Sequence, residues 1–134
     1  AAGGAAATCP DVVAMHDPTE GGLSGALYEM ASGAGLGIAI EAAAVVVAPE
    51  TEAVCAGLGL DPWGLLASGS LLVAARPSVT SELESAVGPL LAPARKIGVF
   101  EDGSGVTLIG DGGGAVPVFI RDELARFLER RTQR

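Results

Sequence analysis

The chain has 134 residues, which is enough for one domain with its own hydrophobic core. Hydrophobic residues make up 49% of it but aromatic residues only 4%, so we expect a core of small aliphatic side chains. The formal net charge is −8 and no basic cluster precedes the C-terminal segment, which argues against nucleic acid as a partner.

Hydropathy and the cysteine and histidine content exclude further classes of protein. No segment reaches the roughly 18 uninterrupted apolar residues that a membrane-spanning helix needs, and no signal peptide is visible. We therefore expect a cytoplasmic protein without membrane contact. One histidine and two distant cysteines, Cys9 and Cys55, form no zinc motif, and we expect two ordinary thiols rather than a disulfide. Residues 1–9 are predicted to be a flexible tail or linker remnant, and residues 10–134 the domain.

The first elements alternate between strand and helix. An apolar run at 12–15 predicts a buried strand. Apolar residues at helical spacing predict a helix from Gly21 or Gly22 to about residue 32. Alternation over 36–41 predicts a second strand. Residues 42–47 stay ambiguous, because their alanines favour a helix and their valines a strand.

The middle of the chain is expected to continue this alternation. Proline starts a helix at 49 that ends near residue 55 or 56, and Asp61 is expected to cap a short helix through residue 66. The continuous apolar run at 70–75 predicts a strand in the centre of the sheet. The longest helical pattern covers 77–91, and a proline ends it.

The last third contains a predicted hairpin. Strands at 96–100 and 106–109 flank a turn at 102–105, so the sheet is not purely parallel. Residues 116–120 are a possible edge strand, since their proline cannot donate in a central one. A C-terminal helix is predicted over 122–131, with three side chains facing the core: Leu124, Phe127 and Leu128. The fold class is therefore α+β, with helices covering a mixed sheet.

The candidate site is the stretch MHDPTEGGL at 15–23, between the first strand and the first helix. Asp17 and Thr19 are good N-cap residues, and the glycine pair lets a backbone or ligand come close. Exposed N–H groups and the helix dipole attract an anion, whereas Asp17 and Glu20 repel it. Attraction of an anion and repulsion by the carboxylates are compatible if the ligand is a phosphate that carries Mg²⁺, because the carboxylates can then hold the metal or its waters.

An ordinary capped turn explains the same residues about as well. A lone histidine such as His16 is more often hydrogen-bonded than catalytic; if functional, it could touch a phosphate or move a proton. Residues 68–70 could line a pocket but are more typical of a turn. The glycine-rich stretch at 111–114 lacks the Lys and Ser/Thr of a P-loop and is predicted to be a loop.

Residues 14–23, with LYEMA at 27–31, resemble the opening of the C-terminal domain of the aminoimidazole ribonucleotide (AIR) synthetase-related superfamily. Its members include that purine enzyme, selenophosphate synthetase, thiamine-monophosphate kinase and the hydrogenase-maturation protein HypE. The form of the motif is most similar to the HypE branch. Later stretches extend the resemblance over about 10–128: LGLDP at 58–62, SGSLLVA at 68–74 and KIGVF at 96–100.

The resemblance implies a three-layer α/β/α fold with a mixed sheet and partly ferredoxin-like topology. It also implies an enzyme that uses ATP and Mg²⁺ to phosphorylate an oxygen, or to activate it for displacement. The nucleotide binds mainly to a separate N-terminal domain near a homodimer interface, and this domain closes over it. By this resemblance His16 and Asp17 are candidate catalytic residues. The candidate cofactor-binding residues are Asp17, Thr19, Gly21 and Gly22; no residue is assigned as a metal ligand.

Three departures limit what the resemblance implies. The nucleotide domain is absent from these 134 residues, so the isolated chain is expected to be inactive. Ser68-Gly69 stands where many HypE sequences have Glu-Gly. The 134 residues also end without the terminal cysteine that carries the HypE carboxamide, which argues against that dehydration if this end is the native one. The acceptor is thus left open, as a small molecule or a carboxamide, and hydrogenase-maturation proteins are possible partners. The alternative is a non-catalytic scaffold, or a protein-binding or oligomerisation module.

Overall fold

The computed structural model describes residues 11–79, 94–110 and 113–132. Within them one sheet pairs β1 (Val12–His16) with β3 (Leu72–Ala75). The other sheet has the order β4 (Gly98–Glu101), β2 (Gly37–Glu41), β5 (Val106–Ile109), β6 (Gly114–Ala115). The helices are α2 (Gly22–Ala34), α3 (Pro49–Leu58) and α5 (Glu123–Thr132), with short 3₁₀ helices η1 (Ala42–Ala44), η2 (Pro62–Gly64) and η3 (Pro77–Val79). The expected tail and most of the expected helix at 77–91 lie outside the described residues.

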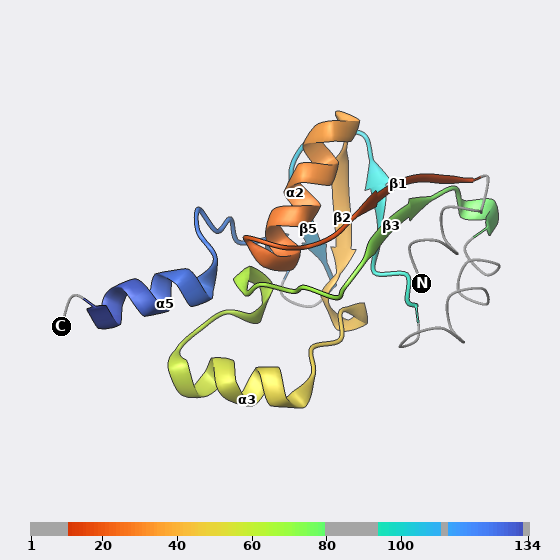
Figure 1. Ribbon diagram of the computed structural model, residues 1–134. Helices are drawn as coiled ribbons and strands as arrows, with labels where there is room; N and C mark the ends of the chain where they lie inside the picture. The colour runs from red at the N-terminus through yellow and green to blue at the C-terminus, as the bar shows by residue number, and fades with distance from the viewer. Residues whose placement is uncertain (1–10, 80–93, 111–112, 133–134) are drawn as a thin grey trace.

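The core lies between α2 and the four-stranded sheet, as Figure 1 shows. It is built from mostly small aliphatic side chains, which confirms the expectation from composition: Leu27, Ala31, Ile38, Ile40, Val106 and Val116. The hydroxyl of Tyr28 donates to the carbonyl of Val116 at 2.7 Å, and that of Ser24 donates to the carbonyl of Pro117. These bonds connect α2 to the segment that directly follows the edge strand β6.

The predicted hairpin between β4 and β5 is wrong, because β2 lies between them. β2 is antiparallel to β4 and parallel to β5, so the sheet is mixed as expected. The four residues at 102–105 can span two strand spacings, about 10 Å, since an extended residue covers roughly 3.3 Å. Burial favours this order, because residues 37–40 of β2 are all buried. Glycine at position 98 allows β4 to lie this close to β2, because a Cβ there would lie 2.3 Å from the carbonyl oxygen of Ala39.

The strands β1 and β3 form as expected, but their predicted burial is wrong. Val13 is 69% exposed and Met15 42% exposed. β3 was expected in the centre of the sheet, yet among the described residues it pairs only with β1. A two-stranded ribbon leaves much of its surface open to solvent, whereas a central strand is covered on both faces.

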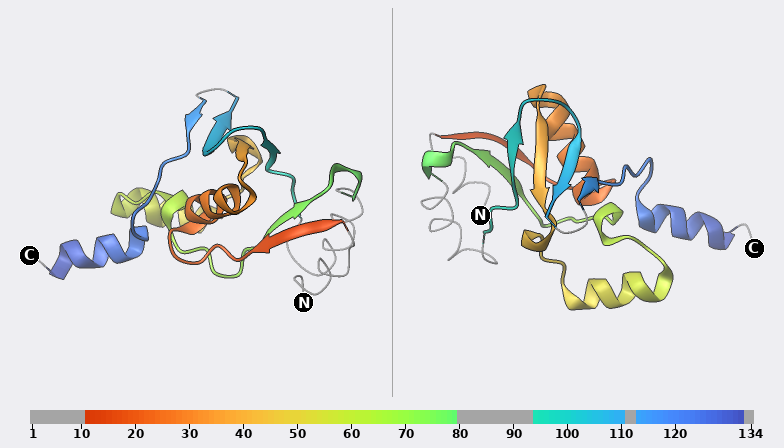
Figure 2. Two further views of the ribbon diagram at one scale, coloured as in Figure 1. Left: turned by 90° about the horizontal axis from the view of Figure 1, so that it is seen from above. Right: turned by 180° about the vertical axis from the view of Figure 1, so that it is seen from behind.

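The C-terminal region also differs from expectation. Residues 116–120 form no strand; the edge strand is β6, just before them. Helix α5 forms, but Leu124 is 41% and Leu128 54% exposed, while Glu123 is 2% exposed. The reason is its position: α5 lies beside η2, to one side of the sheet, rather than across a face (Figures 1 and 2).

Cys55 is a free thiol, only 1% exposed, as expected for an ordinary buried cysteine. Burial raises the pKa of this thiol, and the charges of Asp61 and Glu123 raise it further. In a Cys9→Ser background, we expect Cys55 of the native chain to react with a thiolate-directed reagent at least about 100-fold more slowly than in the urea-unfolded chain. Equal rates in the two states would contradict this burial.

Candidate functional site

The candidate site is the loop at 17–21, which joins β1 to α2. Pro18 is fully buried, and its carbonyl accepts the N–H of Ala67 at 3.3 Å. The neighbouring side chains of Asp17, Thr19 and Glu20 are exposed. The loop is thus anchored on its inner side and presents two carboxylates and a hydroxyl to solvent.

The glycine pair has a packing role. Gly21 and Gly22 are buried and have φ values of +78° and +63°, which L side chains rarely adopt. A Cβ on Gly22 would lie 2.5 Å from the carbonyl oxygen of Leu65 and 2.6 Å from that of Trp63. The first turn of α2 therefore packs directly on η2 and the residue that follows it.

The expected side-chain caps of α2 are wrong. The N-cap is Gly21, and no side chain caps the helix. The N–H of Gly22 donates to the carbonyl of Thr19 at 3.1 Å, which closes a backbone turn before the helix begins. Because this turn replaces the cap, the side chains of Asp17 and Thr19 remain available for a ligand.

His16 ends β1 and contacts both the loop and the helix. Its Nδ1 lies 3.0 Å from the carbonyl oxygen of Asp17, and its Nε2 lies 2.6 Å from Oε2 of Glu29 on α2. The side chain of His16 is 28% exposed and that of Glu29 is 67% exposed. Glu29 was not singled out from the sequence, since a spacing of thirteen residues matches no site motif.

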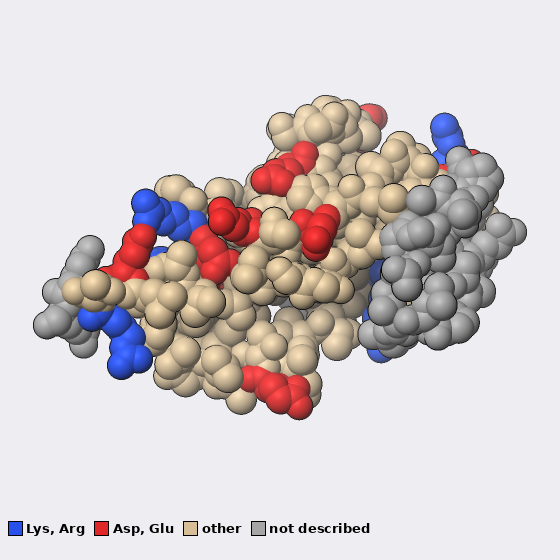
Figure 3. Space-filling model, viewed as in Figure 1, with Lys and Arg blue, Asp and Glu red and all other residues tan. Residues whose placement is uncertain are grey.

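The described residues contain no cluster of three or more His, Cys, Asp or Glu side chains that could hold a metal ion by themselves. On the face seen in Figure 1, acidic side chains lie over α2 and near its N-terminal end, over α3, and beside the basic ones of α5, while other basic side chains lie at the opposite end of the molecule (Figure 3). The carboxylates on this face would repel a bare anion.

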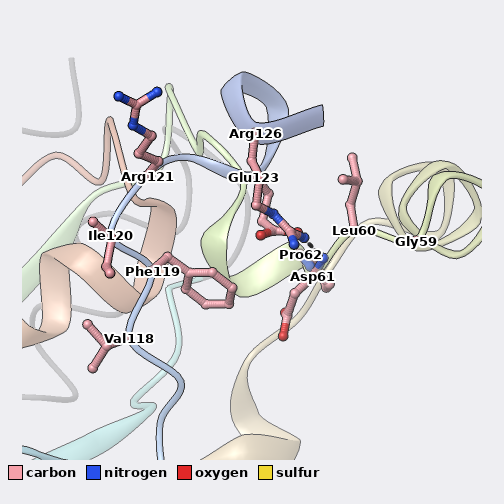
Figure 4. Close-up of a pocket in the computed structure, with 10 residues that line it drawn as sticks. All are labelled: Gly59, Leu60, Asp61, Pro62, Val118, Phe119, Ile120, Arg121, Glu123 and Arg126. Atoms are coloured by element: carbon pink, nitrogen blue, oxygen red, sulfur yellow. Dashed lines mark hydrogen bonds and ion pairs between the residues drawn. The ribbon is translucent and has the colours of Figure 1, made fainter. Parts of the chain in front are cut away.

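A pocket apart from this loop lies between the turn after α3 and the segment that leads into α5 (Figure 4). This pocket has a volume of about 860 Å³. Its buried Glu123 accepts the N–H of Asp61 at 3.1 Å and pairs with Arg126. Asp61 in turn caps η2, its Oδ1 accepting the N–H of Trp63 at 2.9 Å, as predicted. Glu123 and Asp61 are thus bonded within the protein, whereas Nε of Arg126 is buried without a hydrogen-bond partner among the described residues.

The fold and this loop place the chain in a known class of domains. Residues 4–111 match the sequence profile of the family described as AIR synthase related protein, C-terminal domain, and the chain belongs to that family. Carbamoyl dehydratase HypE of Cupriavidus necator is 39% identical to it over 100 residues, which are 72% of this chain and 28% of the relative. HypE of Escherichia coli is 34% identical over 103 residues, 75% of this chain and 31% of the relative. The chain thus spans less than a third of these relatives.

Solved structures agree with this assignment. The crystal structure of E. coli HypE matches with a TM-score of 0.84 and 28% identity, over 94% of this chain and 40% of that one. A HypE structure in complex with ATP matches with a TM-score of 0.73 and 22% identity, over 84% of this chain and 37% of that one, which shows the fold alone. The predicted family, its HypE branch and the fold class are confirmed.

No helix in the described part of the chain is long and apolar enough to cross a membrane.

Proposed function

We propose that this chain is the C-terminal domain of an ATP-dependent, HypE-like enzyme and closes over the phosphates of Mg²⁺-bound ATP and the acceptor. The family and the HypE relatives support this class of enzyme. The observation that carries the proposal is the anchored loop: Asp17 and Thr19 are exposed while Pro18 between them is buried. The rest of the protein supplies the main nucleotide site.

The side chains of the loop fit the outer part of such a site. Mg²⁺ prefers oxygen ligands and is usually held by one or two carboxylates together with substrate phosphates. Asp17, with Glu20 beside it, would hold the metal or its waters, and the hydroxyl of Thr19 would donate to a phosphate or acceptor oxygen. When bound, the metal neutralises charge on the phosphates. The expected exposure of the N–H groups is wrong for the glycine pair: Gly21 and Gly22 are buried, and the N–H of Gly22 donates to Thr19. Direct contact of either glycine with a phosphate stays a prediction.

The reaction proposed is transfer of the γ-phosphoryl group to an acceptor oxygen. The acceptor oxygen forms a bond to the γ-phosphorus while the bond to the β–γ bridging oxygen breaks, and ADP leaves. A carboxamide oxygen suits this step, since carboxamide dehydration requires its oxygen to become a leaving group. The domain contributes by positioning and by excluding water when it closes.

The complete gene product tests the proposal. We expect ADP release that requires Mg²⁺ and increases when a carboxamide acceptor is added, measured with a coupled assay. A complete, folded gene product that neither binds ATP in calorimetry nor releases ADP would contradict the proposal and favour the scaffold alternative. The cytoplasmic location, the homodimer and the hydrogenase-maturation partners stay predictions of the same proposal.

A further inference from the structure

We infer that Glu29 is a positioning residue that acts through His16 on the backbone of the loop. Nε2 of His16 lies 2.6 Å from Oε2 of Glu29, and Nδ1 lies 3.0 Å from the carbonyl oxygen of Asp17. The imidazole thus links the middle of α2 to the first residue of the loop. We call the contact Glu29–His16–Asp17 carbonyl the brace.

The chemistry of the partners shows what the imidazole does in this arrangement. A carbonyl oxygen and a carboxylate are both acceptors, so both ring nitrogens donate when both bonds are made. A general base must face the group from which it takes a proton, whereas both ring nitrogens of His16 face acceptors within the protein. The geometry therefore assigns His16 to positioning rather than to proton abstraction, and leaves Asp17 as the group that faces a ligand.

The brace acts next to a second anchor. The carbonyl of Asp17 is held by His16, and the carbonyl of the next residue, Pro18, accepts the N–H of Ala67 at 3.3 Å. Two consecutive carbonyls are therefore bound, one to the imidazole and one to the chain after η2. Loss of the first bond frees the carbonyl of Asp17 and leaves the bond from Ala67 to Pro18 as the nearest hydrogen bond between the loop and another segment. The effect of losing this bond on turnover rests on the function proposed above.

Hydrogen exchange of the 134-residue chain tests the brace without any ligand. Two amides report on the loop: Ala67, which donates to Pro18, and Gly22, which donates to Thr19. Glu29→Gln keeps an acceptor oxygen but loses the charge, and Glu29→Ala loses both. In Glu29→Ala we expect both amides to exchange about three- to fivefold faster, with a smaller increase in Glu29→Gln; the change is modest because the pair is partly exposed to solvent. The amide of Glu41, bonded to the carbonyl of Ile97 at 2.9 Å, is the internal reference. The matched variant is Glu101→Gln, an exposed carboxylate at the end of β4.

Wild-type exchange at Ala67 and Gly22 in both Glu29→Gln and Glu29→Ala would overturn the inference, as would equal acceleration in Glu101→Gln. A second pair of variants separates positioning from proton transfer in the complete gene product. Asparagine places an N–H near Nδ1 and glutamine one near Nε2, so His16→Asn and His16→Gln each retain one half of the brace.

For a positioning role, we expect both His16 variants and Glu29→Gln to lower kcat about three- to tenfold with little change in KM for ATP. A loss of 100-fold or more in both His16 variants, with Glu29→Gln silent, would instead make His16 a proton-transfer residue and overturn the inference. Faster exchange in Glu29→Gln alongside a wild-type gene product that does not use ATP would support the brace and contradict the proposed function.

Discussion

Replacement of Gly22 by alanine is expected to destabilise the domain by about 3 kcal/mol or more, the largest effect on stability that we predict. An L residue at φ +63° costs about 1–2 kcal/mol, and forced overpacking typically costs a further 1–3 kcal/mol. The added Cβ would meet backbone oxygens of Trp63 and Leu65 at 2.6 and 2.5 Å, and backbone cannot rotate away as a side chain can. Either α2 or η2 has to move.

Thermal or urea unfolding measures this change, with the fluorescence of Trp63, the single tryptophan, as a probe beside the contact. A loss of this size lowers Tm by roughly 10 °C for a chain of this length. The control is Gly33→Ala in the same helix, where a Cβ meets nothing within 4 Å. Gly33→Ala should stabilise the chain by about 0.5–1 kcal/mol, because alanine loses less backbone entropy in a helix. Equal stability of Gly22→Ala and wild type would refute the packing of the loop on η2.

Substitution of Asp17 by asparagine should have the largest effect on activity. Under the proposed function, kcat/KM for ATP falls about 100- to 1000-fold, the range seen when one group that stabilises transition-state charge is removed. The carboxylate is exposed and makes no side-chain bond among the described residues, so the domain should remain folded. Thr19→Ala removes one neutral hydroxyl, and we expect a smaller loss of about tenfold.

The assay uses the complete gene product and measures ADP release across a range of Mg²⁺ concentrations. Asp102→Asn makes the same chemical change at an exposed position in the turn between β4 and β5, and it should leave the rate unchanged. If Asp17→Asn and Thr19→Ala both turn over at the wild-type rate, the loop takes no part in the mechanism. Unfolding curves of each variant then show that the result does not come from misfolding.

The local structure around the site follows closely from the residues. Apolar spacing predicted the helix after the glycine pair, and α2 begins at Gly22 as expected. Gly35, with φ +66°, ends it. The strand at 36–41 formed as Gly37–Glu41, since alternation within its own residues predicts an extended chain, although its partners lie far along the sequence. The Asp61 cap also formed, because it joins residues two apart.

Features that depend on distant residues were predicted less well. The turn at 102–105 is a good hairpin signal, yet β2 takes the place between its flanking strands, because the apolar residues at 37–40 are best buried in the centre. Helix α5 has a clear apolar stripe, but Glu123 at its start is the buried residue, since it receives the N–H of Asp61. No pattern among neighbouring residues predicts the position of β2 between β4 and β5 or the burial of Glu123.

The family, the order of most elements and the position of the loop between strand and helix can all be read from the amino acids, because short-range backbone preferences and the motif at 15–23 encode them. Which loop groups face solvent, and what holds them, arises only when the chain folds. Burial of Pro18 and Gly22 requires η2 and the residues after it, and the bond from His16 to Glu29 requires β1 and α2 to meet. Such contacts join residues that are distant along the chain, so their energies are defined only by the packed three-dimensional arrangement.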